Sequence, residues 1–333
     1  MNETKIENKA PVCEAPELLT VEPSPHIKSG VTTWRIMRDV IVALLPACLF
    51  GVYQFGWRAA VLLAIGVISA VLFEWLTQKL LKRKSTIHDL SAVVTGLLIS
   101  MNLPSSVPFW MPVVGSFVAI VLIKQLFGGI GKNFLNPALA ARVFLFLSWS
   151  DKMATFAPPR GVDAVAYATP LASLTESGEA GASVLDMFLG KTGGCIGEIS
   201  ALLLILGGIY MIVRRVITWH IPVCYLLTVA VFALVLPESG AMFDLGNMLT
   251  QLFAGGLMLG AIFMATDYVT CPITKWGRVI FGIGCGLITV LFRAFSSYPE
   301  GVSFAILVMN SLVWYIDKVT KPRVFGGVKH GKK

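Results

Sequence analysis

The run "WRAAVLLAIGVISAVLFEWLTQKLLKRK" (Trp57–Lys84) decides the fold class of this protein. Residues 57–78 are nearly all apolar, and roughly 20 apolar residues are enough for a helix to cross the hydrocarbon core of a bilayer. The run then ends in a basic group that comprises Lys79, Lys82, Arg83 and Lys84. Basic residues beside a span are typical of its cytoplasmic end. The run therefore predicts a transmembrane helix that ends at the cytoplasmic surface.

The composition of the whole chain leads to the same class. Of 333 residues, 56% are hydrophobic and 14% are charged, whereas soluble domains carry about 25% charged residues. We therefore expect an integral membrane protein, with the lipid bilayer as one of its partners. The net charge of +8 lies mostly beside apolar segments, so we interpret it as membrane topology and expect no nucleic-acid partner. The cysteines and histidines are dispersed without the spacing of metal ligands, so we expect no metal site.

Other segments repeat the pattern of an apolar span. The uniform ones are residues 36–55, 108–127, 197–213, 219–236 and 276–294. Less uniform segments, several of them short or broken by Gly and Pro, are residues 88–103, 133–149, 245–265 and 301–316. The sequence thus predicts an all-α polytopic membrane protein with about ten transmembrane helices.

The distribution of basic residues predicts the orientation in the membrane. With an even number of spans, both termini lie on the same side. If that side is the cytoplasm, 21 of the 27 Lys and Arg residues face it, five face the other side, and Arg142 falls within a span. This bias follows the positive-inside rule. It places the polar segment 150–195 outside the cytoplasm.

That segment divides the chain into two halves. We expect a polar cytoplasmic tail (1–33), a first five-helix half (34–149), an extracytoplasmic loop (150–195), a second five-helix half (196–317) and a basic cytoplasmic tail (318–333). An odd number of spans per half gives the halves opposite orientations, as in the inverted repeats of many transporters.

Weak internal similarity supports such a repeat. "VTGLL" at Val94–Leu98 resembles "AGGLM" at Ala254–Met258. The turn-rich segments Asn136–Ala140 and Tyr298–Val302 have nearly the same spacing. We therefore expect two inverted five-helix repeats with short or broken helices.

In each half a short span ends in polar sequence that contains proline. These segments are "SMNLPSSVP" after Ile99 and "ATDYVTCP" at Ala265–Pro272. Irregular backbone at membrane depth must be buried in protein or line a cavity, and broken helices of this kind mark binding sites in transporters. The alternative is that both segments are ordinary loops at the membrane surface. Asp267 favours a site in the second segment, because an acidic residue near a span is a functional candidate.

Three other ionisable residues lie within or near predicted spans. We expect Glu74 and Lys124 to extend their charged ends toward the membrane surface, because each lies close to the end of a span. Arg142 has two interpretations, which are a pair with Asp89 and a contact to an anionic cofactor.

The loop contains "DAVAYATPL" (Asp163–Leu171), in which Thr169 lies among small residues. A hydroxyl in such a loop is accessible to another enzyme. "GKT" at Gly190–Thr192 lacks the first glycine of a phosphate-binding loop, and no Ser-His-Asp or Cys-His pattern stands out. We therefore predict no catalytic residue in this chain.

The segment "DAVAYATPL" resembles the D-x-x-[S/T]-[small]-A-T motif on which a flavin transferase esterifies FMN to threonine through its phosphate. This motif occurs in the D-type membrane subunit of Rnf-type ferredoxin:NAD⁺ oxidoreductases and in the related B-type subunit of the sodium-pumping NADH:quinone oxidoreductase. Four other stretches resemble the same family, with the D type fitting better. They are "HIKSGVTTWRIMRDV" (His26–Val40), "GGIGKNFLNPALAARVF" (Gly128–Phe144), "GAIFMATDYVTCPIT" (Gly260–Thr274) and "YPEGVSFAILVMN" (Tyr298–Asn310).

The resemblance implies that Thr169 carries FMN covalently. Asp163, Ala168, Thr169 and Pro170 match the motif, whereas Tyr167 stands where the family usually has a small residue. Tyr167 would either crowd the transferase or stack on the flavin ring. The family's transferases act outside the cytoplasm, which is where the charge bias places Thr169.

The resemblance also implies the wider function. We expect a subunit, inactive alone, of a complex in the bacterial plasma membrane that couples electron transfer between ferredoxin and NAD⁺ to movement of Na⁺ or H⁺. Its partners are then the other subunits and the flavin transferase. Non-covalent riboflavin is a possible second cofactor. The residues that we assign to a second-flavin site or an ion path are Asn136, Arg142, Thr266, Asp267 and Thr270. Two alternatives stay open, which are an inverted-repeat solute channel or transporter without a redox cofactor, and a membrane scaffold whose flavin site has decayed.

Overall fold

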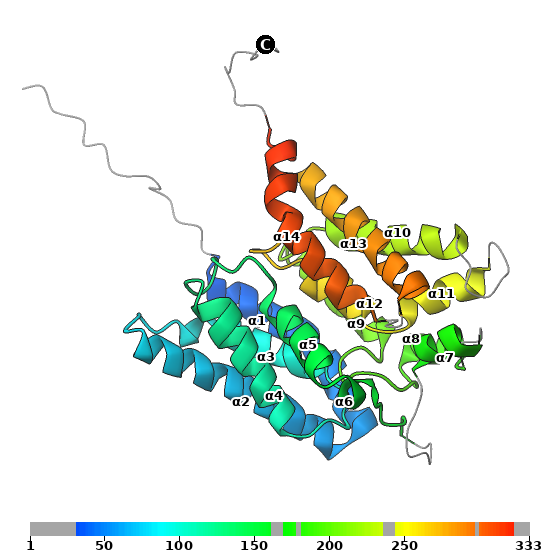
Figure 1. Ribbon diagram of the computed structural model, residues 1–333, viewed down its shortest axis with the longest axis horizontal. Coiled ribbons are helices and arrows are strands. Elements are labelled where there is room, and N and C mark those ends of the chain that lie inside the picture. The colour runs from blue at the N-terminus through cyan, green and yellow to red at the C-terminus, as the bar shows by residue number, and fades with distance from the viewer. Residues whose placement is uncertain (1–30, 161–168, 178–180, 236–243, 297–299, 323–333) are drawn as a thin grey trace, which may run out of the picture. The chain divides into compact units, whose positions relative to one another are not determined.

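A computed structural model describes residues 31–160, 169–177, 181–235, 244–296 and 300–322 (Figure 1). The chain divides into a unit that ends at Thr32 and a unit from Thr33 to Lys333, and the account below concerns the second. Its described residues form helices and connecting segments. They include no β-strand, apart from one isolated antiparallel bridge between Pro104 and Cys195. The predicted all-α class is confirmed for this part of the chain.

The first group of helices precedes the polar segment 150–195. It comprises α1 (Thr33–Phe55), α2 (Trp57–Leu80), α3 (Ser91–Met101), α4 (Trp110–Phe117) and α5 (Pro137–Ser148). A π-helical segment, Val118–Gln125, continues α4 without a break, and a 3₁₀ turn at Ile87–Asp89 leads into α3. The second group comprises α9 (Ala201–Val213), α10 (His220–Val235), α11 (Leu245–Phe253), α12 (Leu257–Leu259) with the π-helical Gly260–Met264, α13 (Lys275–Phe295) and α14 (Val302–Thr320).

Each of the ten predicted spans coincides with helix, but the helices differ in length. Four are long and apolar enough to cross a membrane, namely α1, α2, α13 and α14. A fifth candidate is the pair Leu245–Phe253 and Leu257–Met264, which bends by 63° at its break. The other apolar helices are shorter, and the 11 residues of α3 rise only about 16 Å at 1.5 Å per residue. By length and composition alone, four or five of the ten segments qualify as spans, and the total of ten stays a prediction.

The segment 150–195, predicted as a loop, contains short helices. They are α6 (Ser150–Ala154), α7 (Pro170–Ser177) and α8 (Val184–Leu189). Ser183 caps α8, since its hydroxyl accepts a hydrogen bond from Asp186 N at 3.1 Å, and Gly190 ends the helix in the left-handed conformation. Leu171, Met187 and Ala254 form a small apolar core that joins α7 and α8 to the end of α11.

Small residues let α2 and α3 pack backbone to backbone. A methyl group on Gly96 would lie 2.5 Å from the carbonyl oxygen of Gly66, so neither helix tolerates a larger side chain here without moving. Ser100 and Ser116 donate hydrogen bonds of 3.1 Å to the carbonyls of Leu62 and Gly66. Such contacts are typical of helix packing inside membranes.

The two groups of helices pack in similar ways. In the first, α2 contacts both α3 and α4; in the second, α10 contacts both α11 and α13. Across the groups, α1 contacts α9 and α5 contacts α14. Figure 1 shows α13 and α14 lying side by side, in agreement with their contacts.

The repeat motifs fit this arrangement unevenly. Asn136 begins α5, and Gly301, three residues after Tyr298, precedes α14. In contrast, Val94–Leu98 lies inside α3, whereas Ala254–Met258 includes the break after α11, where Gly255 has a φ of 67°. These two segments have different conformations, and the repeat stays a prediction.

Candidate functional site

Thr169 begins helix α7. Its Oγ1 accepts a hydrogen bond of 3.2 Å from Ala172 N, its carbonyl accepts one of 2.9 Å from Ser173 N, and Pro170 occupies the first helical position. A hydroxyl at this position satisfies one of the free N–H groups at the start of a helix. The Thr169 residue is only 4% exposed. The accessible threonine expected from the sequence is therefore buried in the folded protein.

Thr169 faces a small cavity of about 10 Å³. Its walls include Thr192, Glu198 and three glycines, Gly193, Gly194 and Gly255. A volume of this size holds about one water molecule. Glycine walls bring backbone close to the threonine, because no side chain intervenes. The other predicted motif residues, Asp163, Tyr167 and Ala168, lie outside the described residues.

Glu198 connects this cavity to a buried group of charges. We call this group the Arg142 cluster; it consists of Asn102, Arg142, Cys195, Glu198 and Glu300. Arg142 donates to Asn102 Oδ1 at 2.9 Å and to Glu300 Oε2 at 2.5 Å. Glu198 Oε1 accepts a hydrogen bond of 2.9 Å from Cys195 N. Arg142 pairs with Glu300, so the proposed pairing with Asp89 is wrong.

The first broken helix ends against this cluster. After α3 ends at Met101, the carbonyl of Met101 accepts from Gly197 N at 2.8 Å and that of Leu103 accepts from Ile196 N at 3.0 Å. Leu103 is fully buried. The segment after Ile99 is therefore irregular backbone buried in protein, and the alternative of a surface loop is excluded for it.

A larger cavity, of about 320 Å³, lies near the opposite end of α3. One wall is apolar and includes Met37, Leu98 and Phe263, and the polar groups that face it include Lys124, Ser91, Asn133, Asn136 and Asp267. Its lining comes from α1, α3, α9, both π-helical segments and the loop before α5. A mostly apolar cavity of this size with a few polar groups is typical of a small-molecule site.

The structure brings together four of the five residues predicted for a second site. Asn136, Thr266 and Asp267 line the larger cavity, and Thr270 donates a hydrogen bond of 3.1 Å to Asp267 Oδ2. Asn136 caps α5 through its Oδ1, while its Nδ2 donates to the carbonyl of Met264 at 3.0 Å. Arg142 lies apart from them in the Arg142 cluster.

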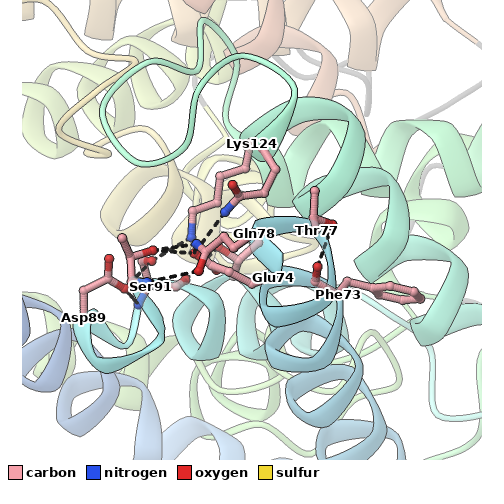
Figure 2. A network of polar contacts seen from close by, with 10 residues as sticks. Phe73, Glu74, Thr77, Gln78, Asp89, Ser91 and Lys124 are labelled. Carbon is pink, nitrogen blue, oxygen red and sulfur yellow. Dashed lines mark hydrogen bonds and ion pairs between the residues drawn. The ribbon is translucent and has the colours of Figure 1, made fainter. Parts of the chain in front are cut away.

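Lys124 joins the larger cavity to a second buried polar group, drawn in Figure 2. We call it the Glu74 cluster; it consists of Glu74, Gln78, Thr86, Ser91, Lys124 and Gln125. Lys124 Nζ lies 2.7 Å from Glu74 Oε2 and 2.6 Å from Ser91 Oγ. The other carboxylate oxygen of Glu74 accepts from Gln78, Thr86 and Gln125, each at 3.1 Å.

Two sequence interpretations are corrected by the Glu74 cluster. Glu74 is 0% exposed and Lys124 is 3% exposed, so neither extends its charge to the membrane surface as expected. A charge buried in a low dielectric must be paired and hydrogen-bonded, and these two residues satisfy each other. The spacing of 50 residues between them carries no sequence signal for the pair.

Sequence reasoning also missed Cys195, Glu198 and Glu300. Glu300 lies in the turn-rich segment Tyr298–Val302, and Cys195 is one of the dispersed cysteines, for which we expect no metal site. Only their place next to predicted spans could have marked the two acids as candidates. Their meeting depends on how the segments 195–198 and 300–301 pack together, which no local pattern specifies.

These observations define a class of protein: a helical membrane protein with broken helices, two buried charge clusters and a cavity of ligand size. Residues 20–326 match the model of the NQR2, RnfD, RnfE family. Because this match covers most of the chain, the protein belongs to that family.

Curated relatives cover almost the whole chain. It is 50% identical over 319 residues to the D subunit of the Na(+)-translocating ferredoxin:NAD(+) oxidoreductase complex of Acetobacterium woodii, with 95% of this chain and 98% of that protein aligned. It is 42% identical over 320 residues to the D subunit of the proton-translocating ferredoxin:NAD(+) oxidoreductase complex of Clostridium ljungdahlii, with 93% and 96% aligned. It is 39% identical to the D subunit of the ion-translocating oxidoreductase complex of Stutzerimonas stutzeri, with 92% and 95% aligned.

The buried Glu74–Lys124 pair leads to a stability prediction. Lys124→Met leaves a buried carboxylate without its cation, which costs about 3–5 kcal/mol, whereas the double variant Glu74→Gln/Lys124→Met removes both charges and should recover most of the loss. The measurement is the thermal unfolding midpoint of the detergent-solubilised complex. Arg214→Met is the control, because Arg214 pairs with Asp39 through a side chain that is 49% exposed. Equal destabilisation by the single and double variants would contradict the prediction.

Proposed function

We propose that this chain is the D subunit of an ion-translocating ferredoxin:NAD⁺ oxidoreductase complex and carries FMN covalently on Thr169. The identity of 50% to such a subunit over 95% of the chain carries the proposal. The chain acts with the other subunits of the complex and is inactive alone. It lies in the bacterial plasma membrane as ten helices in two inverted repeats, with both termini in the cytoplasm and Thr169 on the other side.

The contacts between the two groups of helices support the inverted-repeat architecture. Corresponding helices meet across the groups, since α1 contacts α9 and α5 contacts α14. The contacts of α2 with α3 and α4 are repeated by those of α10 with α11 and α13. Paired contacts of this kind are what a pseudo-two-fold relation between two halves requires.

The electrostatic surroundings of Thr169 favour the phosphate of FMN. The threonine Oγ lies at the start of α7, where the positive end of the helix dipole favours an anion. Arg293 lies close by, because its Nη2 donates to the carbonyl of Ala254 at 3.2 Å, and Ala254 lines the same cavity. The cavity of about 10 Å³ has room for about one water molecule, so both the phosphate and the flavin ring extend beyond it.

The attached flavin would supply one-electron and two-electron transfer, and the residues around it would provide its hydrogen bonds and its burial. A phosphoester to Thr169 leaves the ring unmodified, so hydrogen bonds and burial tune its potential. Because Thr169 is 4% exposed, a flavin transferase has to modify it before α7 packs against α8 and α11. The attachment then keeps the cofactor on the outer face.

Covalent attachment gives a direct prediction. When a flavin transferase is co-expressed, the wild-type band should fluoresce after denaturing electrophoresis, and the Thr169→Ala band should be dark because the ester oxygen is gone. Thr192→Ala is the matched control, since Thr192 lines the same cavity and should leave the band fluorescent. A dark wild-type band, with the transferase active on another substrate, would favour the channel or scaffold alternatives.

The larger cavity suits a second, non-covalent flavin such as riboflavin. Its volume of about 320 Å³ and its apolar wall fit a planar ring, and Asn136 and Asp267 are placed to hydrogen-bond the polar edge. A neutral ligand without phosphate agrees with the mixed charges of Lys124 and Asp267.

Filling this cavity should remove the second flavin alone. Val40 lines it, so Val40→Trp should reduce the flavin released from the complex by denaturation while the covalent band stays fluorescent. The measurement is chromatography of the released cofactor. Val42→Trp is the control, because Val42 is 43% exposed on the same helix and should leave the flavin content unchanged. Normal flavin in both variants would place the ligand elsewhere.

Ion coupling involves the segment after the second broken helix. Asp267, Thr266 and Thr270 offer oxygen atoms, which hard cations prefer, and Thr270 already holds the Asp267 carboxylate at 3.1 Å. We expect Asp267→Asn to change the Na⁺ dependence of turnover by the assembled complex. Asp317→Asn tests the specificity, because it removes a charge near Ile273 outside the cavity. An unchanged Na⁺ dependence in Asp267→Asn would exclude this residue from the ion path.

A further inference from the structure

The Arg142 cluster gathers three reactive side chains from segments far apart in the sequence. The Sγ of Cys195 and one carboxylate oxygen each of Glu198 and Glu300 all lie within 4.8 Å of one another. Glu198 precedes α9 and Glu300 precedes α14, so neither residue lies within a helix. Packing alone does not require two acids here, because apolar residues fill a buried space at lower cost.

A metal ion does not fit this group. Arg142 Nη2 lies 2.5 Å from Glu300 Oε2 and 3.9 Å from the Sγ of Cys195. A cation bound between the three side chains would therefore meet a guanidinium at close range, and like charges repel strongly in a buried site. A proton, in contrast, forms an O–H bond on one carboxylate oxygen and needs no space between the three side chains.

Glu198 has an oxygen available for such a proton. The residue is 5% exposed, and its Oε2 is inaccessible and has no hydrogen-bond partner among the described residues. A methyl group on Gly256 would lie 2.9 Å from this oxygen and 3.1 Å from Arg142 Nη1, so a larger residue at this position would press on both. A buried oxygen without a hydrogen-bond partner is costly, and an O–H group shared within the pair supplies that partner.

The charges around the pair are evenly balanced. Two arginines face it, Arg142 from α5 and Arg293 from α13, and the carboxyls are Glu198 and Glu300. Burial raises the pKa of Cys195 well above its usual value, so the thiol stays neutral. Burial, and then the charge of Glu198, raise the pKa of Glu300 against the opposing effect of Arg142. A raised carboxyl pKa means that a proton binds at a pH where a free carboxyl is ionised.

Glu198 and Thr169 line the same cavity. We propose that Glu198 and Glu300 form a carboxyl pair that takes up one proton when the flavin on Thr169 is reduced. This inference rests on the covalent flavin proposed above. The ring stays within the length of its own tether from Thr169, and a charge added there acts on the pair through a medium of low dielectric.

The step balances in charge and in atoms. Electrons arrive from ferredoxin through the complex, and for one electron gained by the flavin one proton leaves the solvent and forms an O–H bond on the pair. Re-oxidation of the flavin releases that proton, and no other bond forms or breaks. The electron on the flavin and the proton on the carboxyl pair thus lie close together inside the protein. An electron without a compensating proton would be unfavourable there.

Infrared difference spectroscopy of the intact complex tests the pair directly. The reduced-minus-oxidised spectrum should show a new carbonyl stretch of a protonated carboxylic acid in the wild type. Glu198→Gln and Glu300→Gln should both lose this band, and each should take up about one proton fewer on reduction in a weakly buffered solution. Asp151→Asn is the matched control, because Asp151 is an exposed acid in the same 150–195 segment and its variant should keep the band.

Thr169→Ala separates this inference from the function on which it rests. Loss of the carboxylic band in Thr169→Ala, together with a fluorescent wild-type band in the gel, supports the coupling. A fluorescent wild-type band with no carboxylic band on reduction overturns the coupling and leaves the covalent flavin standing. A dark wild-type band overturns both. If either glutamine variant fails to assemble, the wild-type and Thr169→Ala spectra still decide the outcome.

Discussion

The hydrocarbon core of a membrane offers no hydrogen-bond partner, and the broken helix α3 is built around that constraint. The carbonyls at its end and just beyond it are paired, because Gly197 N donates to the carbonyl of Met101 and Ile196 N donates to the carbonyl of Leu103. The same segment carries Glu198, so the need to satisfy α3 also fixes one side of the Thr169 cavity. A structural requirement at the end of one helix thereby positions the residues next to the proposed flavin.

The two buried charge clusters lie at opposite ends of α3. Ser91, its first residue, contacts Lys124 in the Glu74 cluster, and Asn102, just after its last residue, contacts Arg142. The 11 residues of α3 cover about 16 Å. One cluster borders the larger cavity and the other borders the cavity of Thr169. If both cavities hold flavins, each redox centre has ionisable groups beside it, which is an arrangement suited to coupling electrons with ions.

The fold class and the helical segments could be predicted because they depend on local composition. Each apolar segment identified in the sequence overlaps a helix of the structure. The number of membrane crossings stays a prediction, because hydropathy does not separate a full span from a short buried helix such as α3. The short helices of the 150–195 segment could not be predicted, since helices such as α8 lack the length for a periodic signal.

The candidate site was predictable only where a motif is contiguous. Thr169 lies in one short motif, and Asn136, Thr266 and Asp267 lie in distinctive stretches that the fold brings to one cavity. The pairs Glu74–Lys124 and Arg142–Glu300 join residues 50 and 158 positions apart. Such pairs depend on how helices pack, so sequence reasoning placed Glu74 and Lys124 at the surface and offered Asp89, not Glu300, as the carboxylate partner of Arg142.

The Glu74 cluster depends on the number of residues in the π-helical stretch Val118–Gln125, and not only on which residues it contains. Lys124 and Gln125 both reach Glu74 from this wide turn, which contains more residues per turn than an α-helix. Losing one residue upstream within it would rotate both side chains by roughly 100° about the axis. A relative could then keep the lysine and glutamine and still lack the cluster. An evolutionary comparison of these proteins therefore has to count residues between Trp110 and Gln125 before it compares their identities.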